Sequence, residues 1–169
     1  VVAELKRLGL RPAMLTGDNP AVAQEVGAQL GISDVRAGLL PEDKVEAVRQ
    51  LAASGGGLAM VGDGINDAPA LAAAEVGVAV GGAGSAAAME TADVVLMSGD
   101  LSRLPFAVRL ARRTLGLIRQ NVAVSLGVKL LFILLALNGW ATLWMAVAAD
   151  MGVSLLVTLN GLRPLRMKA

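Results

Sequence analysis

Residues 1–100 alternate short apolar runs with longer stretches in which apolar and polar positions mix. Four runs are bounded by glycine or polar residues and have the length of buried parallel strands, at 13–16, 58–61, 76–80 and 94–97. Between them, Pro20–Leu30 and Pro41–Ala53 show amphipathic helical spacing, and each begins with a proline. Strand–helix alternation predicts a doubly wound α/β parallel sheet, in which ligands bind at the carboxyl ends of the strands.

A different pattern begins at residue 101. Residues 101–120 read as a basic helix that contains five arginines. Lys129 is the one ionisable residue in 121–137, and Asp150 is the one in 140–159, with an Asn-Gly turn signal between the two stretches. Each stretch has the length of about 17–20 residues that a helix needs to cross a hydrocarbon core of roughly 30 Å. The alternative is a pair of buried helices in a soluble core.

The charges favour the membrane interpretation. Residues 1–100 contain 13 acidic and 6 basic residues, whereas residues 101–169 contain 1 acidic and 9 basic residues, so the net charge of +1 conceals a division between the halves. Basic residues flank the outer ends of both apolar stretches, and Trp140 and Trp144 lie near the turn. This arrangement predicts a multi-pass membrane protein with a hairpin at 121–160, whose segment 1–120 and basic tail 161–169 are cytoplasmic.

The composition excludes several kinds of chemistry. Hydrophobic residues make up 55% of the chain and charged residues 17%, which argues against intrinsic disorder. The chain has no cysteine and no histidine, so a disulfide framework, a cysteine or histidine metal site and a Ser-His-Asp triad are all excluded. Aromatic residues are only 2%, and the basic residues flank membrane spans, so nothing indicates a nucleic-acid partner.

Polar residues that could carry chemistry follow the predicted strands. Thr16 follows the first strand, Lys44 lies near the start of a helix, and Asp63 and Asp67 follow the strand at 58–61. Because strand-end loops converge at one edge of a parallel sheet, we expect a hydroxyl, an ammonium and two carboxylates around one point. Such a set suits a phosphoryl group and Mg²⁺.

Each signal also has a plain structural interpretation. Asp18 and Asn19 are suited to cap the helix that begins at Pro20, Lys44 alone is typical of a surface residue, and a lone Gly-Asp-Gly is typical of a turn. The string GDGINDAPAL at 62–71 is too long to match a motif by accident.

That string resembles the hinge motif of P-type ATPases. MLTGDN at 14–19 resembles the TGD motif of the same family, and PEDK at 41–44 resembles its conserved-lysine loop, in the family's order. The resemblance covers essentially the whole chain. It implies a haloacid dehalogenase-like phosphorylation domain in 1–100, a connecting helix in 101–120 and the last membrane hairpin of an ATP-driven ion pump that works through an aspartyl-phosphate.

The resemblance implies roles for individual residues. Thr16 would bind the phosphoryl group, and Gly17 and Asp18 belong to the motif that meets the nucleotide. Lys44 would stabilise the phosphorylated aspartate.

The hinge motif carries the metal-binding part of the implied site. Asp63 would coordinate Mg²⁺, Asp67 would support that metal site, and Asn66 lies beside it.

One departure limits these expectations. The nucleophile of the family lies in a DKTGT motif, which this chain lacks, as it lacks the actuator and nucleotide-binding domains. The chain begins at Val1 without a methionine, and we expect it to be the C-terminal piece of a longer polypeptide that holds most of the ATP site. Alone, it should not hydrolyse ATP.

Two charges within the hairpin bear on the ion. Lys129 precedes Gly139 by 10 residues and Asp150 follows it by 11, so both lie about 15 Å deep, near the bilayer midplane. They can pair across the hairpin. Such a pair is either structural, or a cation site in which Asp150 binds a divalent metal and Lys129 is its counter-ion.

The sequence Asp150-Met151-Gly152, with a lysine in the preceding helix, resembles the zinc, cadmium and lead subgroup of heavy-metal pumps. That resemblance implies a metal exporter in the bacterial plasma membrane. The alternatives are a pump for copper or potassium, a truncated and non-catalytic membrane remnant, and a soluble phosphatase of the same superfamily, although the last would not carry the hairpin.

Overall fold

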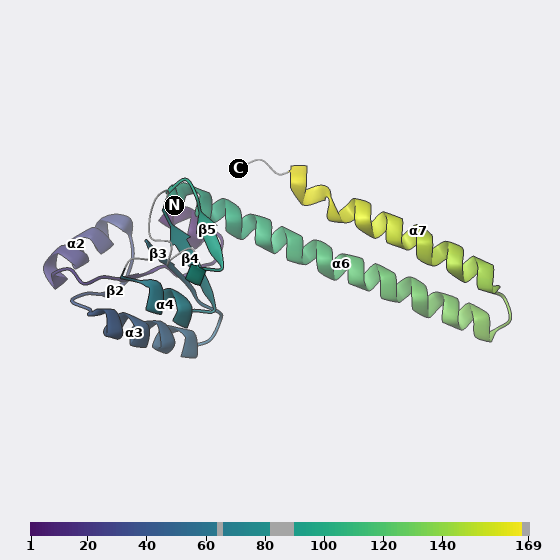
Figure 1. Ribbon diagram of the computed structural model, residues 1–169, viewed down its shortest axis with the longest axis horizontal. Coiled ribbons are helices and arrows are strands. Elements are labelled where there is room, and N and C mark those ends of the chain that lie inside the picture. The colour runs from purple at the N-terminus through teal and green to yellow at the C-terminus, as the bar shows by residue number, and fades with distance from the viewer. Residues whose placement is uncertain (64–65, 82–89, 167–169) are drawn as a thin grey trace. The chain divides into compact units, whose positions relative to one another are not determined.

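The computed structural model describes residues 1–63, 66–81 and 90–166, and Figure 1 traces its helices and strands. Positions 64 and 65 of the 62–71 string, and residues 167–169 of the predicted tail, lie outside the described residues. The chain forms two compact units, Val1–Pro105 and Phe106–Ala169, and each is described by itself.

The first unit alternates strands and helices along the described sequence. Its elements are α1 (Val2–Arg7), β1 (Ala13–Leu15), α2 (Pro20–Leu30), β2 (Asp34–Arg36), α3 (Pro41–Ala53), β3 (Ala59–Gly62), α4 (Ala68–Ala73), β4 (Val76–Val80), β5 (Val94–Leu96) and the 3-10 turn η1 (Leu101–Arg103).

The strands of this unit pair in parallel, as the alternation predicts. β1 pairs with β2, with Met14 opposite Val35, and β4 lies between β3 and β5 in a second sheet. The described strands therefore form two parallel sheets, of two and three strands. β2 was not predicted, because Asp34–Arg36 contains a single apolar residue and no apolar run; its pairing with β1 makes it a strand.

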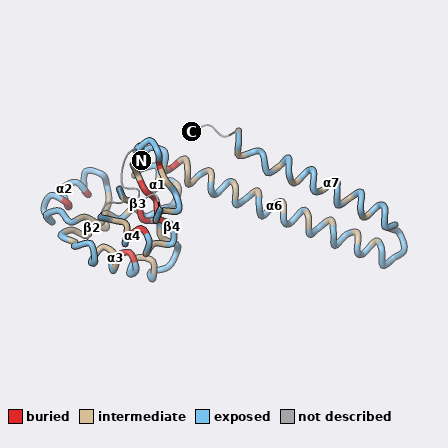
Figure 2. Tube along the Cα trace, in the orientation of Figure 1, coloured by how far each residue is buried: buried red, intermediate tan, exposed pale blue. Residues whose placement is uncertain are grey.

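The core of this unit is small and lies between α3, α4 and the sheet of β3. Val48, Met60, Ala70 and Leu71 form the buried cluster, and the buried residues appear red in Figure 2. Gly27 brings α2 close to β2, since a Cβ added there would lie 2.5 Å from Cγ2 of Val35.

Asp100 caps the 3-10 turn η1, which leads into the next helix. Its carboxylate accepts hydrogen bonds from the Ser102 hydroxyl, at 2.7 Å, and from the Ser102 backbone N–H, at 2.8 Å. These hydrogen bonds, the one from the hydroxyl first, lower the pKa of Asp100 below its ordinary value because they stabilise the charged carboxylate.

The second unit consists mainly of two long helices, α6 (Leu104–Leu137) and α7 (Leu143–Gly161), which are followed by the turn η2 (Arg163–Arg166). The first two residues of α6 belong to the first unit. The two helices run antiparallel and side by side in Figure 1. Gly139 closes α6 with a φ of 73°, a conformation that glycine adopts without strain, and the Thr142 side chain caps α7. The Asn-Gly turn is thus where the sequence predicts it.

Both helices have the length and composition of membrane spans. Their most apolar windows have mean hydropathies of 1.9 and 1.5, and no part of either window is buried. Leucine and valine side chains cover their surface, so the packing is unlike that of a buried helix pair in a soluble core. The predicted basic helix and first apolar stretch join without a break, because nothing around Asn121 interrupts the helical pattern.

Candidate functional site

The loop after β1 is held against the loop after β2 by backbone hydrogen bonds. The Thr16 N–H donates to the Arg36 carbonyl at 2.9 Å, and the Leu39 N–H donates to the Thr16 carbonyl at 3.1 Å. Gly17 permits this approach, since a Cβ added there would lie 3.1 Å from the Leu39 carbonyl oxygen. The Thr16 hydroxyl therefore has a fixed position at the carboxyl end of β1.

Thr16 and Asp18 form a local pair within that loop. The Thr16 hydroxyl donates to Oδ2 of Asp18 at 2.9 Å, and the Asp18 N–H donates back to the Thr16 hydroxyl oxygen at 3.1 Å. Asn19 is the residue that caps α2, because its side chain accepts the Ala21 N–H at 2.8 Å. The capping interpretation thus holds for Asn19, whereas the side chain of Asp18 is engaged with Thr16.

Lys44 lies in the first turns of α3 and forms an ion pair with a carboxylate that precedes α4. Its Nζ lies 2.7 Å from Oδ1 of Asp67, which precedes α4, and the two side chains are only 17% and 15% exposed. The start of α3 is fixed by the Asp43 carboxylate, which accepts the Leu40 N–H at 3.0 Å. Lys44 is therefore a largely covered cation with a specific carboxylate partner, not a solvated surface lysine.

Gly62 makes room for the Asp67 carboxylate. A Cβ added at Gly62 would lie 2.9 Å from both Cβ and Oδ2 of Asp67, closer than real Cβ contacts allow. The close neighbour of Gly62 is thus a side chain of the same loop. This positioning role was not foreseen, since only the folded loop shows which atoms meet.

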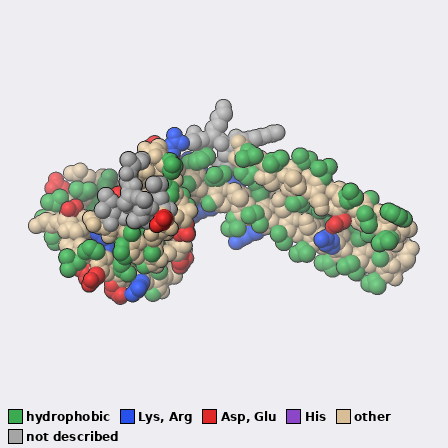
Figure 3. Space-filling view, viewed as in Figure 1, with side chains coloured by type: hydrophobic (Ala, Val, Ile, Leu, Met, Phe, Trp, Pro, Cys, Tyr) green, Lys and Arg blue, Asp and Glu red, His purple; other side chains and the backbone are tan. Residues whose placement is uncertain are grey.

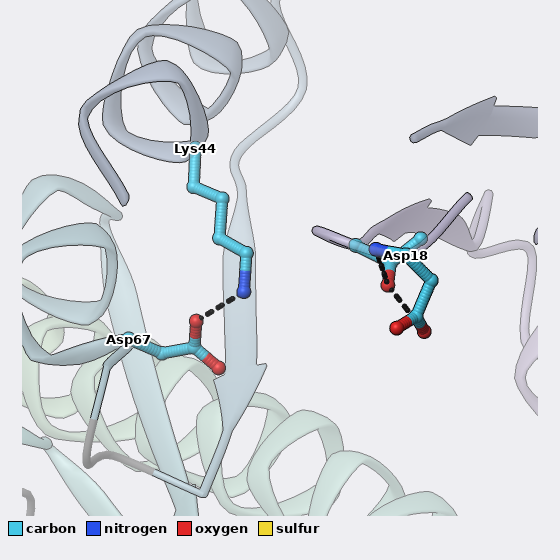
Figure 4. A network of polar contacts seen from close by, with 4 residues as sticks. Asp18, Lys44 and Asp67 are labelled. Carbon is cyan, nitrogen blue, oxygen red and sulfur yellow. Dashed lines mark hydrogen bonds and ion pairs between the residues drawn. The ribbon is translucent and has the colours of Figure 1, made fainter. Parts of the chain in front are cut away.

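The polar side chains that the sequence predicts to lie around one point are therefore brought together only in part. Figure 4 shows Lys44 and Asp67 joined by a dashed line and Asp18 in its own contact. Among the residues that the structure describes, no hydrogen bond or ion pair joins the Thr16–Asp18 pair to the Lys44–Asp67 pair. Asp63 and Asn66 follow β3 and are exposed.

The described residues offer two carboxylates for Mg²⁺, Asp63 and Asp67. Nowhere in 1–63, 66–81 or 90–166 do three or more acidic side chains gather into a metal-binding group. Mg²⁺ typically keeps several waters and binds one or two carboxylates together with substrate phosphate oxygens. The donor set fits a magnesium site that is completed by a phosphoryl group.

The hairpin contains a second lysine–aspartate pair. Lys129 of α6 and Asp150 of α7 approach to 3.6 Å between Nζ and Oδ1, and the side chains are 62% and 60% exposed. Figure 3 shows a basic and an acidic side chain next to each other on the largely apolar surface of the hairpin. The structure thus brings together the two charges that the sequence places at equal depth.

Comparison with known families agrees with the fold. The family of haloacid dehalogenase-like hydrolases matches residues 1–75. The predicted haloacid dehalogenase-like fold, with parallel sheets and two long apolar helices, is confirmed by this match and by the solved structures below.

Relatives match nearly the whole chain. A probable cadmium-transporting ATPase of Listeria monocytogenes is 56% identical over 99% of this chain. A cadmium, zinc and cobalt-transporting ATPase of Bacillus subtilis is 50% identical over 99% of it. The chain spans 24% of the length of each of these relatives.

Among solved structures, the crystal structure of a zinc-transporting PIB-type ATPase in the E2.Pi state is similar over 98% of this chain, with 49% identity and a TM-score of 0.92, and the chain covers 27% of that protein. Over nearly its whole length, the chain is thus homologous to the cadmium- and zinc-transporting P-type ATPases, of which it spans about a quarter.

Proposed function

We propose that this chain is part of an ATP-driven exporter of Zn²⁺, Cd²⁺ or Pb²⁺ that works through an aspartyl-phosphate. The observation that carries the proposal is the Lys129–Asp150 pair, because each of these charges at membrane depth is the one ionisable residue of its apolar stretch, 121–137 or 140–159. A charged side chain costs about 2.5–3.5 kcal/mol at the centre of a membrane helix on insertion scales, so its presence there points to function. The homology to cadmium- and zinc-transporting ATPases supports the same conclusion.

In the first unit, we assign the phosphoryl-binding role to Thr16 and Lys44. The Thr16 hydroxyl, which donates to Asp18 in this structure, would donate instead to a phosphate oxygen, with Gly17 and Asp18 on the nucleotide side of that loop. Lys44 neutralises charge that develops on the transferred phosphoryl group. The nucleophilic aspartate and most of the ATP site would belong to the remainder of the polypeptide.

Asp63 and Asp67 are the residues that we assign to Mg²⁺, with Asn66 beside them. Bound Mg²⁺ would neutralise negative charge on the phosphoryl oxygens. Lys44 holds Oδ1 of Asp67, and this contact fixes the orientation of the second carboxylate. Gly62 acts with it, because any larger residue would displace Asp67.

In the hairpin, Asp150 would bind the transported cation, and Lys129 would be its counter-ion when the site is empty. A carboxylate suits Zn²⁺ better than Cu(I), which prefers sulfur ligands. The 3.6 Å separation is longer than that of a close charge-assisted hydrogen bond. A divalent cation can therefore compete with the ammonium for the carboxylate.

We place the protein in a membrane, bacterial plasma membrane by homology, with residues 1–120 and the C-terminus in the cytoplasm. The support is the charge pattern at the ends of the two candidate spans. Lipid and the remainder of the polypeptide would be its partners.

The first test concerns the ion. In the full-length polypeptide, Asp150→Ala should reduce Zn²⁺-stimulated ATP hydrolysis by at least about tenfold, since it removes a proposed ligand. Thr158→Val is a matched control on the same helix. Unchanged metal stimulation in Asp150→Ala would refute the site, and stimulation by Cu(I) or K⁺ in place of Zn²⁺ would assign the pump to another ion.

The second test concerns magnesium. Asp63→Asn should block formation or turnover of the phosphoenzyme in the full-length polypeptide, whereas Glu46→Gln on the exposed side of α3 should not. Normal phosphoenzyme turnover in Asp63→Asn would disprove the magnesium assignment.

A further inference from the structure

Two asparagines meet between the helices of the hairpin, away from the Lys129–Asp150 pair. The Asn160 side-chain amide donates to Oδ1 of Asn121 at 2.7 Å. The Asn121 amide in turn donates to the backbone carbonyl of Val157 at 3.3 Å, and Arg163 donates to Oδ1 of Asn160 at 3.2 Å. Both asparagines are half-buried, in a hairpin whose surface is mostly exposed leucine and valine.

The amide contacts and the ion pair belong to one antiparallel register. Asn121 precedes Lys129 by 8 residues on α6, and Asn160 follows Asp150 by 10 residues on α7. These spacings correspond to about 12 and 15 Å along the two helix axes, so the two contacts are successive rungs of the same pairing. A slide by one residue would shift one helix by about 1.5 Å and turn its side chains by about 100°.

The amides can specify this register because their partners are few. A buried amide without a hydrogen-bond partner is costly, and more so in an apolar medium. Most neighbouring positions on the two helices are apolar, among them Val122, Ala123 and Leu159, and such side chains cannot replace the Asn121–Asn160 hydrogen bond. A single buried asparagine is known to fix the register of paired helices in coiled coils, and the same reasoning applies here.

We propose that Asn121 and Asn160 form an amide clamp that sets the register of α6 against α7 and thereby holds Lys129 and Asp150 at a common depth. They are positioning residues. The register itself is independent of what the chain transports, whereas the effect on the cation rests on the proposed function.

The register is measured in the chain itself, reconstituted in lipid vesicles. The chain has no cysteine, so two introduced thiols are its only thiols. Val128→Cys is combined with Val153→Cys, which lies nearly opposite because it precedes Asn160 by the same seven residues by which Val128 follows Asn121, or with Val157→Cys, one turn farther along α7. Each pair is treated with a short bifunctional thiol reagent. We expect the first pair to crosslink at least about tenfold faster, given a rise of 1.5 Å per residue.

The clamp is then removed by Asn160→Leu. We expect the crosslinking preference to fall at least about threefold, because the helices can then slide. Thr158→Val is the matched control, since its hydroxyl donates to the Ser154 carbonyl of its own helix, and it should leave the preference unchanged. Asn160→Gln keeps an amide and should retain more of the preference than leucine does, which separates the clamp from a general failure to fold.

In the full-length polypeptide, Asn160→Leu should raise the Zn²⁺ concentration for half-maximal ATP hydrolysis by about five- to tenfold with a smaller change in kcat, as for supporting residues of metal sites. An unchanged crosslinking preference in Asn160→Leu would overturn the clamp, and so would lost metal activation with an intact register. A shifted register in a polypeptide that no metal stimulates would refute the proposed function and support the clamp.

Discussion

Within the residues that the structure describes, each unit of this chain contains a lysine–aspartate pair, and the two pairs differ in separation and in exposure. Lys44 and Asp67 approach to 2.7 Å with side chains 17% and 15% exposed. Lys129 and Asp150 approach to 3.6 Å with side chains 62% and 60% exposed. The first pair is enclosed by the fold of its own unit, whereas the second lies on the surface of two helices.

The difference indicates what each pair requires from its surroundings. An enclosed pair loses the free energy of hydration of both charges. A short, well-oriented contact between the two charges offsets this loss, so each partner depends on the other. An exposed pair gains little from its contact. At membrane depth, however, charged side chains face other protein groups or a water-filled cavity, and this requirement favours further protein over lipid against that face of the hairpin.

The largest expected effect comes from breaking the enclosed pair. Asp67→Ala would leave the Lys44 ammonium covered and unpaired, and we expect it to reduce the free energy of unfolding by about 2–3 kcal/mol. Chemical denaturation of the detergent-solubilised chain would measure this loss. Glu46→Ala, which removes an exposed carboxylate from the same helix as Lys44, should cost less than about 0.5 kcal/mol; equal losses would mean that enclosure makes no difference.

A somewhat smaller effect is expected when the same pair is disturbed sterically. Gly62→Ala places a methyl group 2.9 Å from Asp67, and overpacking of this kind costs about 1–3 kcal/mol. The loss should shrink in the background of Asp67→Ala, where most of the obstructing side chain is gone. Additive losses in that double-mutant cycle would contradict the positioning role of Gly62.

For the exposed pair, the expected change in stability is small. The double substitution Lys129→Met with Asp150→Leu should alter the free energy of unfolding of the chain in detergent by less than about 1 kcal/mol, because exposed ion pairs contribute little. The same double substitution should abolish Zn²⁺ stimulation of the full-length polypeptide. A loss of stability as large as that of Asp67→Ala would instead favour the structural interpretation of this pair.

The smallest expected effect concerns Asp100, a carboxylate whose partner is a neighbour in sequence. Ser102→Ala removes the hydroxyl hydrogen bond, so the pKa of Asp100 should rise toward its ordinary value. Because the pKa of Asp100 is lowered in the folded chain, its ionised carboxylate stabilises the fold when the pH is above the ordinary pKa of an aspartate. That contribution is lost as the pH falls through the lowered pKa. Carboxyl chemical shifts followed by NMR through a pH titration would measure the change; an unaltered pKa would contradict the assigned cause.

The sequence predicted elements whose signals are local. Pro20 and Pro41 mark the starts of α2 and α3, and the apolar run 76–80 coincides with β4. Asn138 and Gly139 mark the end of α6. These elements can be predicted from the sequence because prolines, glycines and apolar runs influence the backbone within a few residues.

What the sequence did not predict depends on contacts between distant segments. The three residues of β2 become a strand only beside β1. Asp67 was expected to support a metal site, but its contacts with Lys44 and Gly62 become visible only when the loop is folded. The contact between Asn121 and Asn160, which are 39 positions apart in sequence, depends on the register of two helices, and no local pattern contains that register.

Helix α6 runs without interruption from Leu104 to Leu137, and this continuity has a mechanical consequence. The 25 residues from Leu104 to Lys129 make an arm of about 38 Å, so a tilt of about 5° at one end displaces the other by about 3 Å. That displacement is comparable to the length of a metal–ligand bond. If Asp150 binds the transported cation as proposed, a tilt of this size in a stiff α6 is enough to make or break one ligand bond to that cation.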